Sequence, residues 1–232
     1  MAIESKIRPA IPAASRRYFV WAQIVVAFLF LEFALWTPTS EVRNRWAAIA
    51  ALAILAFILI DVSTDGLSQP SRSSLARLGL GLPKLSGAGV VLGTGFATAV
   101  FLVMLVRWAG GQIPANPAWF PNLQSAWGYV IWAMLQEFLL QSFFFNRCEE
   151  LYGSQAAVWM TSTLFAAAHL PNPVLTAAAL IGSLFFCEMF RRYRNIYALG
   201  IVHAMLGLTI ALTMPDSLLH HMRVGIGYLR YR

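Results

Sequence analysis

Seven long apolar segments constrain the fold of this chain more than any other feature of its sequence. Most of them approach the roughly 20 residues that an α-helix needs to cross about 30 Å of hydrocarbon. Of the 232 residues, 59% are hydrophobic and only 12% are charged, which leaves too little polar surface to cover a soluble globule. We therefore expect an all-α, polytopic transmembrane helical bundle of about seven helices. The segments are 18–36, 46–62, 88–108, 127–145, 156–170, 174–190 and 196–214.

The basic residues are distributed as in a membrane protein whose N-terminus lies in the cytoplasm. With that orientation most of the 17 Lys and Arg residues fall in inner segments, in agreement with the positive-inside rule. The first apolar segment is too long for a signal-peptide core and no convincing cleavage site follows it, so we expect it to remain as a span. An eighth span or a re-entrant segment near Pro171 would move the C-terminal tail to the other side. We expect an integral protein of the bacterial inner (cytoplasmic) membrane.

The net charge of +7 does not indicate nucleic-acid binding, because the basic residues are spread over several short loops. Residues 71–85 alternate leucines with basic residues and predict a short amphipathic piece on the inner leaflet, limited by Pro83. No repeat or second domain is visible, and no feature specifies an oligomeric state. We expect one integral membrane domain, residues 1–232. Its parts are a cytoplasmic segment (1–17), a motif-bearing helical core (127–214) and a polar tail (215–232).

Glu137 stands with Gln136 inside the apolar segment 127–145. A carboxylate near the middle of a bilayer costs roughly 3 kcal/mol on insertion scales, so it is rarely left there without a partner or a function. Gln141 follows Glu137 at i+4 and shares its helix face, whereas Gln136 is rotated by about 100°. A dry pocket would raise the pKa of this carboxyl group and a nearby histidine would oppose the rise, so Glu137 is a candidate general base.

Two histidines stand in comparably apolar surroundings, His169 and His203. At about 1.5 Å rise per residue, Glu137 lies roughly 15 Å and His203 roughly 13 Å from the inner ends of their helices, and His169 lies deeper, at roughly 22 Å. Each histidine alone is more often a packing or capping residue than a catalyst. Three such residues in the middle zone of the membrane favour a functional site.

Other chemistries leave different patterns. The sequence has no His-Glu-x-x-His zinc pair, no rhomboid-type Gly-x-Ser-Gly stretch and no acidic residue in Gly225-Ile226-Gly227-Tyr228 of the kind that aspartyl intramembrane proteases use. Glu137, His169 and His203 could form a zinc site with an open water position, which we rank second to a site without metal. Glu188 precedes Arg191 and Arg192 at i+3 and i+4, which predicts a structural ion pair.

Three motifs along the core resemble those of the CPBP family, the CAAX-protease and bacteriocin-processing intramembrane proteins. Residues 136–141 occupy the frame of the family's Glu-Glu-x-x-x-Arg, and Phe165-Ala166-Ala167-Ala168-His169 matches its Phe-x-x-x-His. His203 to Gly207 occupies the frame of its His-x-x-x-Asn or Asp. Each motif alone is weak, but their order on hydrophobic helices is typical of the family.

The resemblance implies a glutamate-dependent endopeptidase without a metal, in which a glutamate activates water while histidines and an Asn hold the water and the developing oxyanion. In this chain the family's first Glu is Gln136, its Arg is Gln141 and its Asn is Gly207. Either Glu137 serves as the base in a shifted geometry, or the protein resembles a protease without being one.

The leading hypothesis is an intramembrane endopeptidase that acts on a membrane-associated or lipidated peptide, within membrane lipid and with no cofactor. Glu137, His169 and His203 are then the catalytic residues. We expect substrate-binding residues at Gln136, Gln141, Phe165 and Asn172. The alternatives are a non-proteolytic relative that binds or transforms an isoprenoid-type small molecule, and a catalytically silent scaffold. The tail around His220 and His221 either folds over the cavity mouth and supplies missing donors or is a solvated basic segment.

Overall fold

The computed structural model describes residues 13–66, 72–82, 84–111 and 123–231, and all regular structure within them is helical. Residues 1–12 of the predicted cytoplasmic segment, and Pro83, lie outside the described residues. The elements in chain order are α1 (Ala13–Trp36), α2 (Ser40–Gly66), α3 (Arg72–Arg77), α4 (Leu85–Trp108), α5 (Leu123–Glu137), the π-helix η1 (Phe138–Phe145), α6 (Asn146–Tyr152), α7 (Ser154–Ala167), α8 (Pro173–Tyr193), α9 (Ile196–Thr213), α10 (Asp216–Leu219), the 3₁₀-helix η2 (His220–Met222) and α11 (Ile226–Leu229).

Every predicted apolar segment is helical over most of its length, which confirms the all-α fold. Four helices among the described residues, α1, α4, α8 and α9, are long and apolar enough to cross a membrane. The fourth predicted segment is a continuous helix whose type changes along its length. α5, η1 and α6 follow one another without a gap. At 14 residues, α7 is shorter than a typical span.

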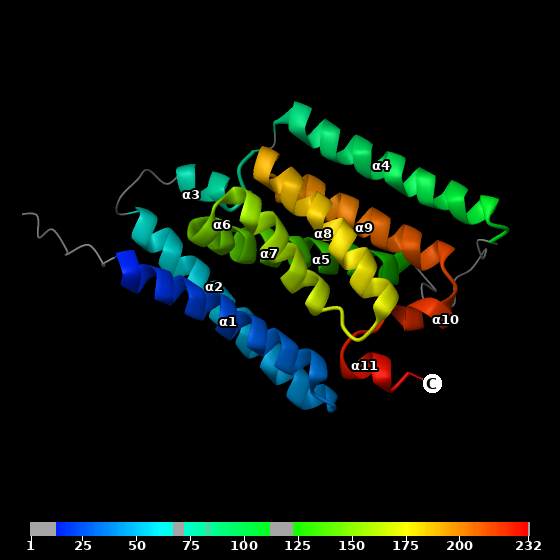
Figure 1. Cartoon of the computed structure of the whole chain (residues 1–232), viewed down its shortest axis with the longest axis horizontal. Coiled ribbons are helices and arrows are strands. Elements are labelled where there is room, and N and C mark those ends of the chain that lie inside the picture. The colour runs from blue at the N-terminus through cyan, green and yellow to red at the C-terminus, as the bar shows by residue number, and fades with distance from the viewer. Residues whose placement is uncertain (1–12, 67–71, 83, 112–122, 232) are drawn as a thin grey trace, which may run out of the picture.

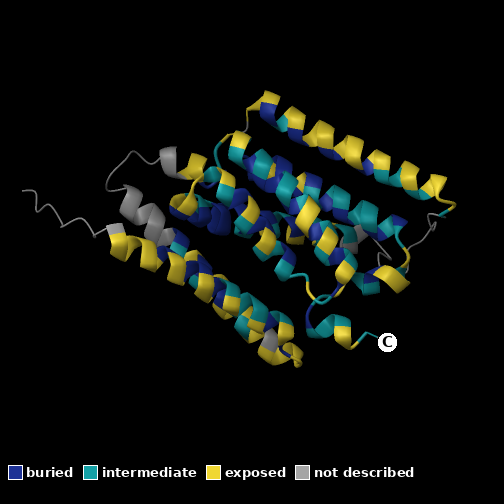
Figure 2. Ribbon diagram, viewed as in Figure 1, coloured by how far each residue is buried: buried dark blue, intermediate teal, exposed yellow. Residues whose placement is uncertain are grey.

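The long helices form two groups (Figure 1). α1 and α2 pack against each other as an antiparallel pair, and α1 also contacts α6. The larger group holds α4 to α9, in which α7 packs on α8, and α9 is flanked by α4 and α5. The outer face of α4 is exposed and carries large apolar side chains such as Phe96, Phe101 and Met104 (Figure 2). Such a face is suited to lipid.

The core is built around η1 and the helices that surround it. Phe143, Phe145, Phe190 and Leu199 are among its largest fully buried side chains. The ring of Phe145 meets that of Phe190 edge-on at 5.4 Å between centroids. Since aromatic pairs of this geometry add roughly 0.5–1.5 kcal/mol beyond area burial, η1 is firmly fixed against α8.

Small residues allow α4 to approach α9 closely. Gly87, Val91, Gly95 and Ala99 are the buried residues of α4, spaced four apart on one face. A Cβ atom at Gly95 would lie 2.6 Å from Cγ2 of Val202 in α9, so this position has no room for a side chain. In lipid, where no hydrophobic effect drives helices together, such small-residue faces hold helix pairs by close van der Waals contact.

Basic residues from four predicted inner segments gather at one end of the bundle, which we call the arginine end. Arg16, Arg77 and Arg147 line one cavity there, and Nη2 of Arg194 contacts both carboxylate oxygens of Glu149 at 2.5 Å. Arg194 itself adopts a left-handed conformation (φ 47°) that ends α8. The structure therefore brings together the segments that the charge pattern placed on one side.

The C-terminal tail docks at the opposite end, which we call the tail end. Leu219 is fully buried, and the backbone N–H of Gly225 donates to the carbonyl of Leu170 over 2.8 Å. Arg230 donates through Nη1 to the carbonyl of Pro38 in the α1–α2 connection. Of the two alternatives for the tail, the described residues are docked and do not form a solvated segment, because these bonds fix the tail to two interhelical connections.

The predicted amphipathic piece is only partly helical. Within 71–85, α3 occupies six residues, and Leu78 beyond it is buried. Leu82 and Leu85 are almost fully exposed, at 99% and 89%. Exposed leucines beside basic residues are suited to a membrane surface.

Candidate active site

Glu137 is the last residue of α5 and is fully buried. Its Oε1 lies 2.9 Å from Nδ1 of His203, and its Oε2 accepts a hydrogen bond of 3.1 Å from Nε2 of Gln141. Because a buried carboxylate is tolerated only where such partners replace its lost hydration, these bonds explain how α5 can carry Glu137 inside the bundle. The structure thus brings together Glu137, Gln141 and His203, as the sequence predicted.

The helix changes type directly after Glu137, where η1 begins. π-Helical turns are rare, and they occur frequently at functional sites. In η1 the residues from Leu140 to Phe145 are all buried, including Gln141 and Ser142. This wide turn places the amide of Gln141 back against the carboxylate while three consecutive phenylalanines enter the core.

His203 lies on α9 with 12% of its side chain exposed. Phe186 of α8 stacks on the imidazole with centroids 5.2 Å apart and 15° between the planes, and Phe165 meets it edge-on at 5.9 Å. An ionised Glu137 accepts from Nδ1–H, so Nε2 is the nitrogen that points to other partners. The two rings restrict rotation of the imidazole.

His169 lies just beyond the C-terminus of α7. Its Nδ1 is 2.7 Å from the carbonyl oxygen of Phe165, and the two rings are 4.6 Å apart. A carbonyl oxygen only accepts, so Nδ1 carries the proton and Nε2 of the neutral ring is an acceptor. The ring of Phe165 contacts both imidazoles and therefore joins His169 to the pair formed by Glu137 and His203.

Asn172 is fully buried, but its hydrogen bonds are those of the scaffold. Its Oδ1 accepts from the N–H of Leu175 and caps α8, and its Nδ2 donates to the carbonyls of Leu219 and Arg223 at 2.9 and 3.2 Å. Both amide protons are thereby used to hold the tail. Gln136 is half-buried on α5 beside Glu137.

Comparison with known proteins identifies the part of the chain that carries these residues. Residues 117–209 match the family model described as type II CAAX prenyl endopeptidase Rce1-like. This part of the chain is similar to that family. It contains the three predicted motifs, which confirms the predicted family resemblance over these residues. The comparisons with curated proteins and with solved structures find no match.

The Rce1-like part contains one residue that sequence reasoning missed. A Cβ atom at Gly207 would collide with the hydroxyl of Tyr129 and would lie 2.7 Å from its Cζ. Tyr129 on α5 therefore occupies the space that a side chain at position 207 of α9 would need. The sequence did carry a signal for this contact: it has glycine at position 207, where the resemblance places an Asn. A missing side chain leaves room for another group.

A buried acceptor also lies beside the carboxylate. Oε1 of Gln141 is buried and has no hydrogen-bond partner among the described residues, whereas its Nε2 is bonded to Glu137. Leaving such an acceptor unpaired costs roughly 1–3 kcal/mol, so it is a point where a donor from a bound molecule would be stabilised.

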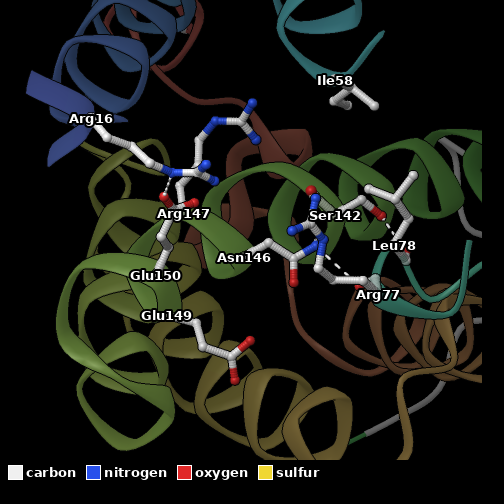
Figure 3. A pocket seen from close by; sticks show the side chains of 9 residues that line it. All are labelled: Arg16, Ile58, Arg77, Leu78, Ser142, Asn146, Arg147, Glu149 and Glu150. Carbon is white, nitrogen blue, oxygen red and sulfur yellow. Dashed lines mark hydrogen bonds and ion pairs between the residues drawn. The ribbon is translucent and has the colours of Figure 1, made fainter. Parts of the chain in front are cut away.

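A cavity of about 430 Å³ opens at the arginine end (Figure 3). Its charged lining is largely ion-paired: Nε of Arg16 lies 2.5 Å from Oε1 of Glu150, and Glu149 is held by Arg194. Ser142 of η1 is the lining residue nearest to Glu137 in sequence, and its hydroxyl donates to the carbonyl of Leu78 over 2.6 Å. The cavity thus reaches the π-helix that follows the buried carboxylate.

Within the part of the chain that the structure describes, no three His, Cys, Asp or Glu side chains are arranged to hold a metal ion. Nδ1 of each central histidine is bonded, to Phe165 in one case and to Glu137 in the other, which leaves Nε2 as the nitrogen open to other partners. The zinc alternative gains no support from these side chains, and no step is derived through a metal.

Proposed function

We propose that this protein is an intramembrane endopeptidase that hydrolyses a membrane-associated or lipidated peptide with Glu137 as general base. The observation that carries the proposal is the direct contact of the fully buried Glu137 with His203 inside an Rce1-like segment. A carboxylate held in this way accepts a proton from water in a site where bulk water does not compete. The match to a CAAX prenyl endopeptidase family supports proteolysis at the level of the family.

In the proposed reaction Glu137 takes a proton from a water molecule as the water oxygen attacks the scissile carbonyl carbon. Collapse of the tetrahedral intermediate breaks the C–N bond, and the proton passes to the leaving nitrogen. His203 donates to Oε1 and keeps the carboxylate oriented, while Phe165 and Phe186 keep the imidazole in place. These contacts fix the base before the substrate arrives, which avoids reorganisation during the reaction.

We propose that His169 binds the attacking water molecule. Its Nε2 is an acceptor because Nδ1–H donates to Phe165, so the ring can accept a hydrogen bond from the attacking molecule. The orphan Oε1 of Gln141 is a second acceptor for water or for a substrate N–H. A water molecule has two hydrogen atoms, so one would bond to Glu137 and the other to one of these acceptors, which would orient the oxygen lone pair towards the carbonyl carbon.

One observation favours the non-proteolytic alternative. Gln136 stands where the family has its first Glu, and an amide cannot accept a proton as a carboxylate does. A relative that binds or transforms an isoprenoid-type molecule would need only the lipid-facing scaffold and one buried acid. The two functions differ in whether a peptide bond is cleaved.

Replacing Glu137 with Gln tests the proposed function. The isosteric amide keeps the hydrogen bonds but cannot take a proton, so we expect cleavage of a lipidated fluorogenic peptide library to fall about 10²–10⁴-fold with little change in melting temperature. The protein is reconstituted in lipid vesicles for the assay. Glu32→Gln is the matched control, because Glu32 also lies in an apolar helix but bonds to Trp36 on α1. Equal loss in both variants, or no cleavage by folded wild type, would overturn the protease.

A further inference from the structure

A phenol oxygen lies in the groove that Gly207 leaves on α9. A Cβ atom added to Gly207 would meet the hydroxyl of Tyr129 and would lie 2.7 and 2.9 Å from its Cζ and Cε1. The end of the side chain, not the middle of the ring, thus reaches the backbone of α9. Only glycine at position 207 permits this approach.

The position of Gly207 places that hydroxyl close to His203. The two residues are four apart on α9, and side chains at i and i+4 share a face with about 5–6 Å between their Cβ atoms. Tyr129 comes from α5, two helical turns before Glu137, and α5 packs on α9 through the contact of Met134 with Gly200. The hydroxyl therefore lies in the interface of the two helices that carry Glu137 and His203, on the side towards the tail end.

We propose that the hydroxyl of Tyr129 is a catalytic hydrogen-bond donor that stabilises the oxyanion of the tetrahedral intermediate. The inference rests on the proposed function of the Glu137 site. When water attacks the carbonyl carbon, the π electrons of the C=O bond move to its oxygen, and the water proton moves to Glu137. Tyr129 keeps its own proton and donates a hydrogen bond to the new oxyanion, so the balance of the reaction is unchanged.

The chemistry of the site requires such a donor. Glu137 is an acceptor when ionised, and Nε2 of neutral His169 is an acceptor as well. Gly207 has no side chain with which to donate, although the resemblance places an Asn there. A phenol on the facing helix supplies an O–H at the same place, and a donor directed at developing charge is worth about 10²–10³ in rate.

Glycine at position 207 makes room for the end of the Tyr129 side chain. A Cβ atom there would meet the hydroxyl and would lie 2.7 Å from Cζ and 2.9 Å from Cε1. Phenylalanine at position 129 would keep both ring carbons in this contact and would remove only the oxygen. Tyr129→Phe therefore changes the hydroxyl without changing how the ring packs on α9.

Tyr129→Phe tests this assignment in the reconstituted, full-length protein. We expect kcat to fall about 10²–10³-fold while KM stays within about twofold, because the donor acts on the intermediate and not on the bound substrate. The Ki of a phosphinic peptide, whose tetrahedral anion mimics the intermediate, should rise by a similar factor. Tyr193→Phe is the matched control, since Tyr193 is a half-buried tyrosine that packs its ring on Gly87 of α4.

A reciprocal exchange separates chemistry from stability. Gly207→Asn alone should destabilise the protein, because its Cβ atom meets the hydroxyl, Cζ and Cε1 of Tyr129. Tyr129→Ala combined with Gly207→Asn removes that clash and should recover part of the kcat that Tyr129→Ala alone loses. Peptide cleavage by wild type that is lost in Glu137→Gln but kept in Tyr129→Phe would overturn this inference and leave the protease standing. A loss in Tyr129→Phe that only follows a lower melting temperature would also overturn it. If folded wild type cleaves no peptide, both proposals fail.

Discussion

Glu137 is a carboxylate with no exposed surface and a hydrogen bond to each oxygen. At the scale of single residues, that arrangement explains why an acid is tolerated inside an apolar helix. Breaking a buried pair by removing one partner typically costs about 3–5 kcal/mol, because the remaining charge is left without compensation. Amide replacements that keep the hydrogen bonds are therefore the informative changes at this site.

Gln136→Glu restores the family's Glu-Glu pair. Gln136 is half-buried, so a carboxylate there keeps some contact with solvent while it adds a second acid beside Glu137. In a protease we expect this variant to retain or raise peptide cleavage in the reconstituted assay. Like-charge repulsion would instead damage a site adapted to other chemistry. Gln155→Glu on the exposed start of α7 is the control for the added charge, and a loss of cleavage confined to Gln136→Glu contradicts the expectation.

At the scale of elements, the site depends on how closely α9 is held by its neighbours. α4 contributes small residues to one side of α9, and α5 contributes Glu137 and Tyr129 to another. The apolar segments of the sequence predicted these helices within a few residues, since apolar length and helical geometry are local properties. It predicted neither the π-helix after Glu137 nor the direct packing of α4 on α9, because both arise from contacts between distant segments.

Gly95→Leu should separate α4 from α9. The new side chain would enter the space of Val202, the residue before His203, and overpacking of this kind costs roughly 1–3 kcal/mol. We expect a lower melting temperature in detergent and reduced peptide cleavage. Gly93→Leu is the matched control, since a Cβ atom at Gly93 would meet nothing within 4 Å. Equal effects of the two substitutions would contradict the packing argument.

At the scale of the whole molecule, the two ends of the bundle differ in character. The arginine end gathers basic side chains from four segments, three of which line a cavity. The tail end is closed by bonds from the tail to Leu170, Asn172 and Pro38. From the charge of the basic segments, the sequence predicted that they lie on the same side of the membrane. It left open whether the tail docks, because isolated polar residues do not specify their hydrogen-bond partners.

Cysteine labelling of intact cells decides which end faces the cytoplasm. The native Cys148 and Cys187 are both buried and should not react with a membrane-impermeant maleimide. Because basic loops are retained inside, we expect Ser217→Cys at the tail end to be labelled from outside. Gln155→Cys at the arginine end should be labelled only after permeabilisation. The opposite pattern would reverse the orientation.

The sequence by itself determined the helices of this protein and the faces on which its polar residues stand, because helix length and i,i+4 spacing follow from local geometry. It thereby predicted Glu137 and Gln141 as neighbours, and it identified His203 as a candidate partner. Only the tertiary structure decided that Nδ1 of His203 bonds to Glu137 across 66 residues, that Phe165 joins the two imidazoles and that Tyr129 fills the groove at Gly207. The tertiary structure also decided that Asn172, predicted as a substrate-binding residue, donates its amide protons to carbonyl groups of the tail. The physical reason is that such contacts depend on how rigid helices pack and rotate against one another, which no single helix encodes.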